Sequence, residues 1–299
     1  MLAALAWEPS KGRISKVQKA LDSAMSSSRT DEAGRLLVRM KKIDAEGAAS
    51  GKYERLEVEL ATKGLLLLGS DEHALVGYVS LPKGWAKGKT YPIVVGAEGA
   101  GCAFAGYARG LATSRGSRAA IVVTPVTLSN TNTLEPAKYP CYPPALLEEW
   151  NGKRLDFDGP GVDALLDVVR KRFGGEEKIF ATGFSGGGNW CYWKLFHDPA
   201  HVRGACPACA NFSGGGTEGA PGAGEGGGPH VLLMTGEKDE HRDHVFGQKP
   251  GIEGQTDFAQ EKLAALGYTR VKRVMVPGAG HSSLHTQVWA FVDEVLAAK

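Results

Sequence analysis

The stretch Gly183-Phe184-Ser185-Gly186-Gly187 is a G-x-S-x-G motif between an apolar run at 178–182 and a helix-like segment at 188–196. In a strand–motif–helix context, the serine occupies a sharp, strained turn that exposes its hydroxyl above the strand ends. The residues two before and two after it must be small, because the strand and helix backbones cross closely there. The helix also directs N–H groups and partial positive charge toward an oxyanion. The chain has 41 glycines, so the motif alone is weak evidence.

Length and charge exclude several other classes of protein. The 299 residues are enough for one large α/β domain with an appendage. The net charge is +2 without a sustained basic tract, which argues against nucleic acid and anionic membranes as partners. No apolar run approaches the roughly 20 residues that span a bilayer. Residues 1–6 are too short for a signal peptide, but Ala4-Leu5-Ala6 resembles a cleavage site. The localisation therefore stays open between secreted or periplasmic, with a trimmed signal, and cytoplasmic.

The five cysteines do not form a disulfide framework, because their number is odd and their spacing irregular. Cys206 and Cys209 form a lone C-x-x-C without the second pair that a zinc site requires. The pair lies in a stretch that resembles a strand, 202–210, and we expect buried thiols there.

The first 50 residues predict two amphipathic helices separated by Ser26-Ser27-Ser28. Each has one apolar stripe, formed by Ile14, Val17, Leu21 and Met25, and by Leu36, Leu37, Met40 and Ile43. We expect an N-terminal helical extension at 1–50 that packs on a catalytic domain at 51–299. A membrane-surface anchor is the less favoured interpretation.

From residue 54 the pattern changes to strands and then to alternating strands and helices. Hairpin strands are predicted at 56–60, 64–68 and 75–79, followed by a buried parallel strand at 93–97. Further strands are expected at 119–124, 179–182, 202–210, 230–234 and 271–276. Helices are expected at 104–115, 162–173, 189–197, 256–266 and 284–298. This alternation predicts an α/β fold with a doubly wound, mostly parallel sheet. The segment at 126–159 is expected to be irregular, and the one at 213–229 mobile.

A serine nucleophile needs a base, and the base needs an orienting carboxylate. In a parallel sheet these groups meet in loops at the carboxyl ends of strands. His281 follows the strand at 271–276, and Asp239 follows the strand at 230–234. The order Ser185, Asp239, His281 is the order that this topology requires. The sequence therefore predicts a Ser-His-Asp catalytic triad.

Other assignments of these residue types are weaker. His285 lies one helical turn beyond His281 and is expected on a helix face. Glu240 and Asp243 are the less favoured alternatives to Asp239. His241, Asp243 and His244 resemble metal ligands, and His281 and His285 form an i,i+4 pair. No glutamate accompanies that pair as H-E-x-x-H would require, so we expect no metal and no cofactor.

The oxyanion hole requires two backbone N–H donors. Gly186 follows the nucleophile and is predicted to supply one. The second should come from the loop after 93–97, where we favour Ala100 and then Gly99.

Together these residues resemble an α/β-hydrolase over roughly 54–299. The segments at 91–95, 181–188, 236–239 and 278–282 are similar to the polyhydroxybutyrate-depolymerase and feruloyl-esterase branch. The resemblance implies hydrolysis of small or polymer-linked carboxylic esters through an acyl-serine, in enzymes that are often secreted.

The sequence departs from that branch at Glu98, where such esterases usually carry histidine before the glycine. Dienelactone hydrolases are similar here, with a glutamate in this loop, but their nucleophile is cysteine. We expect Glu98 to turn aside or be paired, since a carboxylate in an oxyanion hole would oppose catalysis. Substrate contacts are also predicted for Glu98. A set of aromatic residues is expected either to contact substrate or to pack in the core or in loops: Trp150, Tyr142, Trp190 and Tyr139.

Two other functions remain open. A serine peptidase would share the triad, although such enzymes usually add a propeller that 50 N-terminal residues cannot form. A non-catalytic binding protein on a hydrolase scaffold is the third possibility. The sequence leaves the oligomeric state undetermined.

Overall fold

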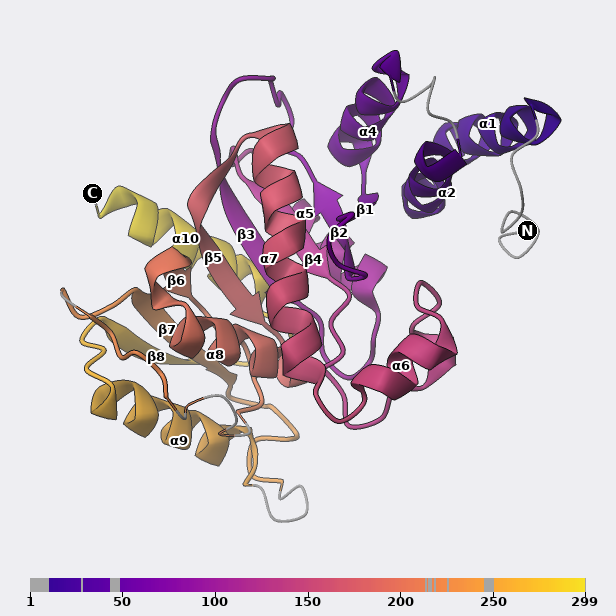
Figure 1. Ribbon diagram of the computed structural model, residues 1–299. Coiled ribbons are helices and arrows are strands. Elements are labelled where there is room, and N and C mark those ends of the chain that lie inside the picture. The colour runs from indigo at the N-terminus through magenta and orange to yellow at the C-terminus, as the bar shows by residue number, and fades with distance from the viewer. Residues whose placement is uncertain are drawn as a thin grey trace.

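The structure is a computed structural model built on one eight-stranded sheet in the order β1-β2-β4-β3-β5-β6-β7-β8 (Figure 1). It describes residues 11–27, 29–43, 49–212, 214, 217, 219–224, 226–244 and 250–298. The strands are β1 Leu66–Gly69, β2 Val76–Ser80, β3 Tyr91–Ala97, β4 Ile121–Pro125, β5 Gly175–Gly183, β6 Val202–Ala205, β7 His230–Gly236 and β8 Val271–Val276. Strand β2 pairs antiparallel with β1 and β4, and the pairs from β4 to β8 are parallel. The prediction of an α/β, doubly wound, mostly parallel sheet is confirmed.

Helices cover both faces of this sheet, which explains the apolar character of its central strands. All five residues of β4 and six of the seven in β3 are buried. Helices α5 Phe104–Ser114 and α10 His285–Ala297 contact each other on one face, where the Trp289 indole donates to Leu111 O at 2.9 Å. The other face carries α7 Arg154–Phe173, α8 Gly188–His197 and α9 Ile252–Ala265 (Figure 1). No helix in the described part of the chain is both long and apolar enough to cross a bilayer.

The N-terminal region contains α1 Lys11–Ser26 and α2 Thr30–Ile43, as the two apolar stripes predict. Four residues of these stripes are buried: Leu21, Leu36, Leu37 and Met40. The structure does not describe the side chains of Ile14, Val17 and Ile43. Helix α2 lies directly against β1, because a Cβ on Gly34 would sit 2.6 Å from Leu67 N.

The strand predicted at 56–60 is wrong, because these residues belong to α4 Lys52–Lys63. Alternating residues also fit a helix here: the buried positions are Tyr53, Glu57, Leu60 and Ala61, which repeat at helical spacing. Glu57 is fully buried and binds the Lys41 ammonium at 2.7 Å and the Arg172 guanidinium. The helical face therefore has a buried ion-pair cluster that a solvent-exposed strand would not provide.

The segment at 126–159 is more regular than the sequence suggests. It contains η2 Pro136–Lys138 and α6 Pro144–Trp150, and α7 starts at Arg154 instead of residue 162. Gly159-Pro160-Gly161 resembles a helix breaker, but its two glycines allow α7 to pack closely against neighbouring segments. A Cβ on Gly159 would lie 2.1 Å from the Trp193 ring, and one on Gly161 would lie 2.6 Å from His73.

Strand β6 ends at Ala205, so the predicted strand at 202–210 is too long. Cys206 and Cys209 follow it as fully buried free thiols, and the other three cysteines are also free. The mobility predicted for 213–229 falls partly on residues outside the described ones (213, 215, 216, 218 and 225).

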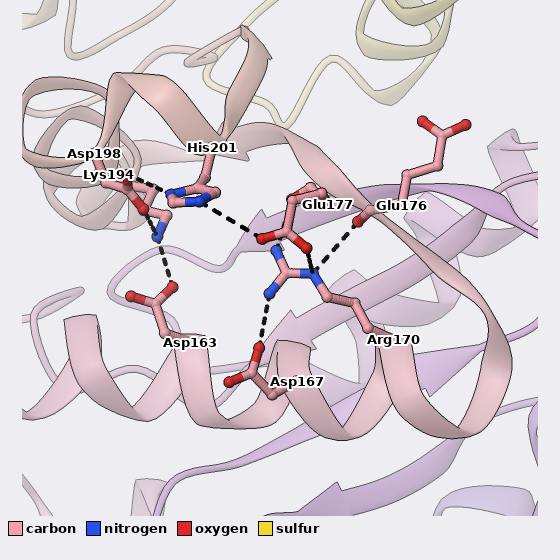
Figure 2. A network of polar contacts seen from close by, with 8 residues as sticks. All are labelled: Asp163, Asp167, Arg170, Glu176, Glu177, Lys194, Asp198 and His201. Atoms are coloured by element: carbon pink, nitrogen blue, oxygen red, sulfur yellow. Dashed lines mark hydrogen bonds and ion pairs between the residues drawn. The ribbon is translucent and has the colours of Figure 1, made fainter.

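Helix α8 is held on α7 and β5 by a network of charged side chains (Figure 2). The Lys194 ammonium is 3 % exposed and binds Asp163 at 2.6 Å and Asp198 at 2.7 Å. His201 Nδ1 lies 2.6 Å from Asp198, and Arg170 pairs with Asp167 at 2.9 Å. This network fixes the position of the helix that follows the G-x-S-x-G motif.

We expect Lys194→Met to lower the free energy of unfolding by about 1–3 kcal/mol, because two carboxylates lose a buried cation. Urea unfolding measures this. Lys171→Met, on the exposed side of α7, is the matched control and should change the free energy by less than about 0.5 kcal/mol. Equal effects of the two substitutions would contradict the role of the network.

The contact between α5 and α10 predicts a pH dependence of stability. The His285 ring packs against Tyr107 at 4.8 Å with Nε2 buried and unbonded, and burial lowers the pKa of His285 to about 4. Between about pH 6.5 and 4, His285 is protonated in the unfolded chain but stays neutral in the folded chain. The free energy of unfolding therefore falls as the pH falls.

Allowing for partial exposure, this histidine should account for about 1–2 kcal/mol of the stability lost between pH 7 and pH 4. In His285→Gln that part of the loss should disappear, as measured by urea unfolding at several pH values. An unchanged pH slope would show that His285 titrates normally.

Candidate active site

Ser185 lies in the strained turn between β5 and α8. Its φ is +48°, and a short η3 turn, Ser185–Gly187, leads into the helix. The backbones around it leave no room for side chains: a Cβ on Gly183 would lie 2.4 Å from Gly187 O, and one on Gly187 would lie 2.2 Å from Ala97 O. The glycine requirement of the motif thus has a physical cause at both positions.

Asp239 and His281 come from the loops after β7 and β8 and contact each other. His281 Nδ1 lies 2.9 Å from Asp239 Oδ2, and the backbone N–H of His241 donates to Asp239 Oδ1 at 2.8 Å. The Asp239 side chain is fully buried, and that of His281 is 12 % exposed. Glu240 instead faces the backbone N–H of His281 at 3.4 Å. Asp239 is therefore the carboxylate that orients the His281 ring.

The His281 ring also lies against the serine turn. It contacts Phe184, the residue before Ser185, with ring centroids 4.9 Å apart. Among the described residues no hydrogen bond joins the Ser185 hydroxyl to His281. Serine–base hydrogen bonds are often long without substrate and tighten when it binds. The structure thus brings the three residues of the predicted triad to one place at the carboxyl ends of β5, β7 and β8.

His241, Asp243 and His244 are not among the possible metal ligands that cluster in the described part of the chain. The group of possible ligands in the described part of the chain is Cys209, Asp239 and His281, whose ligand atoms lie within 4.8 Å of one another. The His241 ring packs edge-on against His281 at 4.6 Å, and Asp243 is exposed. Burial raises the pKa of Cys209 to about 12, so its thiol stays protonated beneath the Asp–His pair. His285 lies on the first turn of α10, away from this cluster.

The loop after β3 lies against the serine. A Cβ on Gly99 would be 3.0 Å from Ser185 Cβ, so a side chain at this position would crowd the serine turn. Glu98 is 7 % exposed; burial raises its pKa, while the backbone amides of Gly99 and Ala103 act in the opposite direction by binding its charged form. The carboxylate is thus paired with amides of its own loop. Because the Gly99 N–H faces Glu98, the Ala100 N–H is the better candidate for an oxyanion donor.

A buried loop after β4 supports this region, and its residues were missed by the sequence analysis. Asn130 is 1 % exposed; its Nδ2 donates to Gly99 O at 2.7 Å, and its Oδ1 accepts from the Tyr139 hydroxyl at 2.9 Å. Fully buried Asp158 of α7 accepts hydrogen bonds from the N–H groups of Leu128 and Ser129, both at 2.8 Å. Burial raises the pKa of Asp158 to about 7 against the effect of these donors. No local sequence signal marks either residue.

The aromatic residues predicted to contact substrate are mostly core residues. Trp190 and Tyr139 are fully buried, and Tyr142 is 6 % exposed with its hydroxyl bonded to Val126 O at 2.7 Å. Buried rings present no surface to a substrate, so for these three the packing interpretation holds. Trp150 is half-buried, packs on Phe157 at 5.5 Å and lies under the Lys153 ammonium.

No protein-family model and no curated protein matches the chain. Several solved structures are similar to the chain in fold. A poly(3-hydroxybutyrate) depolymerase, LpqC of Bordetella parapertussis, superimposes with a TM-score of 0.57 at 16% identity over 82% of this chain and 93% of that one.

Two other solved structures give similar values. Poly(aspartic acid) hydrolase-1 of Sphingomonas sp. KT-1 has a TM-score of 0.54 at 16% identity, over 77% of this chain and 97% of its own. Esterase Est2 of Thermogutta terrifontis, with propionate bound, has a TM-score of 0.52 at 15% identity, over 79% and 94%. By this likeness and by its strand order, the chain has the α/β-hydrolase fold.

Proposed function

We propose that the protein is a serine hydrolase that cleaves carboxylic esters through an acyl-serine intermediate. The observation that carries this proposal is the 2.9 Å contact between Asp239 and His281, placed against the strained turn of Ser185. A buried carboxylate on Nδ1 holds the histidine in the tautomer whose Nε2 can accept a proton. Strain at a non-glycine residue with positive φ is typical of functional sites.

In the proposed mechanism, Ser185 Oγ attacks the ester carbonyl carbon while His281 Nε2 takes the hydroxyl proton. Asp239 stabilises the imidazolium that forms. The N–H groups of Gly186 and Ala100 bind the oxyanion of the tetrahedral intermediate. The intermediate collapses, and His281 gives its proton to the leaving alcohol. Water then attacks the acyl-serine with His281 as base, which releases the acid and restores Ser185.

The choice of esters rests on the neighbours of known structure. One is a poly(3-hydroxybutyrate) depolymerase and another is an esterase bound to propionate, a short acyl product. Both favour short or hydroxyacyl esters, free or polymer-linked. The poly(aspartic acid) hydrolase favours amide hydrolysis as the second candidate. Glu98, whose carboxylate is paired within its own loop, does not oppose either reaction.

In a panel of nitrophenyl esters from acetyl to long-chain acyl, with methyl ferulate added, we expect wild-type protein to hydrolyse the short-chain esters. Ser185→Ala should lose at least about 1,000-fold in kcat with its fold retained. A fluorophosphonate should label wild-type protein only. If no ester were hydrolysed although Ser185 reacted with the fluorophosphonate, the result would support a peptidase or a lactone hydrolase. An unreactive Ser185 would support a non-catalytic binding protein.

Asp239→Asn should lower kcat by about 100- to 10,000-fold, because the amide stabilises the wrong imidazole tautomer. Glu240→Gln is the matched control. Its carboxylate faces only the His281 backbone, so kcat should stay within about threefold. If Glu240→Gln were the more damaging change, the assignment of the orienting carboxylate would be wrong.

A further inference from the structure

Asn130 has all the polar atoms of its side chain committed to neighbours around the serine turn. Its Nδ2 donates to Gly99 O at 2.7 Å, and its Oδ1 accepts from the buried Tyr139 hydroxyl at 2.9 Å. The Cys102 sulfur lies 3.5 Å from Nδ2. An amide that is 1 % exposed and bonded at both ends is held in a single orientation.

We propose that Asn130 is the positioning residue of the oxyanion hole, an inference that rests on the proposed function. The group that Asn130 holds is the Gly99–Ala100 peptide. In a planar trans peptide the C=O of one residue and the N–H of the next point in opposite directions. By holding the Gly99 carbonyl, the Asn130 amide fixes the direction of the Ala100 N–H. A rotated peptide would turn this donor away from the oxyanion.

The Gly99 carbonyl has a second partner, the backbone N–H of Cys102 at 3.1 Å. That bond closes a tight turn within the loop, but it does not tie the loop to the rest of the molecule. The Asn130 bond does so, because Asn130 belongs to the segment after β4. Within the described chain, the Ala100 N–H itself donates to no protein acceptor, so it is free to bind an oxyanion.

The backbone of Asn130 contacts the other half of the proposed oxyanion hole. A Cβ on Gly186 would lie 1.9 Å from Asn130 O, so the Gly186 Cα rests directly on this carbonyl. One residue therefore touches both loops that carry the two donors, the Gly99–Ala100 loop through its side chain and Gly186 through its backbone. The spacing of the donors depends on where Asn130 sits.

Asn130 is itself held from α7. Asp158 binds the N–H groups of Leu128 and Ser129, which directly precede it, and Asn189 Nδ2 of α8 donates to Ser129 O at 3.0 Å. The Gly99 carbonyl selects the amide orientation, because a flipped amide would place Oδ1 against Gly99 O. The contacts thus form a continuous path from α7 to the Ala100 N–H.

The test compares Asn130→Asp with Asn189→Asp in the full-length protein. Asn130→Asp keeps the shape and replaces the donor to Gly99 O by an acceptor, so the peptide is no longer held. We expect kcat to fall about 10- to 100-fold while KM changes less than about threefold. Asn189→Asp makes the same change in an amide that supports the same loop without touching Gly99, so kcat should fall only about 2- to 5-fold, clearly less than in Asn130→Asp.

A transition-state analogue separates positioning from general loosening of the structure. An alkyl trifluoromethyl ketone forms a tetrahedral oxyanion on Ser185, and its Ki should rise in parallel with the loss of kcat. Tyr139→Phe, which removes the bond to Oδ1 and a weak 3.5 Å bond from the Cys102 thiol, should reproduce a smaller part of both effects with the melting temperature close to that of the wild type. This variant keeps the inference testable if Asn130→Asp fails to fold.

This inference would be overturned if Asn130→Asp kept kcat and Ki within about twofold of the wild-type values. Provided that wild-type turnover depends on Ser185, the proposed function would then remain intact. Equal losses in Asn130→Asp and Asn189→Asp would overturn the inference as well, because they would show a structural effect of the loop. A wild-type protein without Ser185-dependent turnover would remove the proposed function itself, and the role of Asn130 with it.

Discussion

The close approach of three backbone segments around Ser185 is the constraint on which the rest of the structure depends. The end of β5, the start of α8 and the loop after β3 meet where no Cβ fits on Gly183 or Gly187. This contact forces Ser185 into a positive φ and holds it there. The sheet, its covering helices and the loops after β7 and β8 then supply partners around a serine whose position is already determined.

Buried polar groups, more than apolar packing, fix the orientation of the parts around this contact. Lys194 ties α8 to α7 through Asp163 and is held in place by Asp198 at the end of its own helix. Asp158 ties the loop after β4 to α7 through two backbone amides. A buried polar group lowers the stability of the fold unless each of its donors and acceptors has a hydrogen-bond partner. Few other arrangements of these segments would satisfy all of them. Helix α7 is thus a common support for the nucleophile turn and for the loop beneath the Gly99–Ala100 peptide.

The predictable parts were those encoded by local pattern and chain order. Apolar runs located the parallel strands, and the requirement for strand carboxyl ends placed Ser185, Asp239 and His281 near one another. Helix α4 was mistaken for a strand, because its alternating residues fit both periods and the decisive partner of Glu57, Arg172, lies 115 residues away in sequence. The contacts of Asn130 and Asp158 escaped prediction for the same reason: they depend on a tertiary fold that brings distant segments together.

Helix α2 rests on β1, the strand at one edge of the sheet, and Lys41 at its end pairs with the buried Glu57 of α4. A truncated protein that begins at residue 51 would lose both contacts. Its β1 would present unpaired backbone groups and the apolar side chains of Leu66, Leu67 and Leu68 to solvent, which is the surface that promotes strand-to-strand aggregation. Helix α2, with α1 packed on it, therefore covers the edge strand of the sheet.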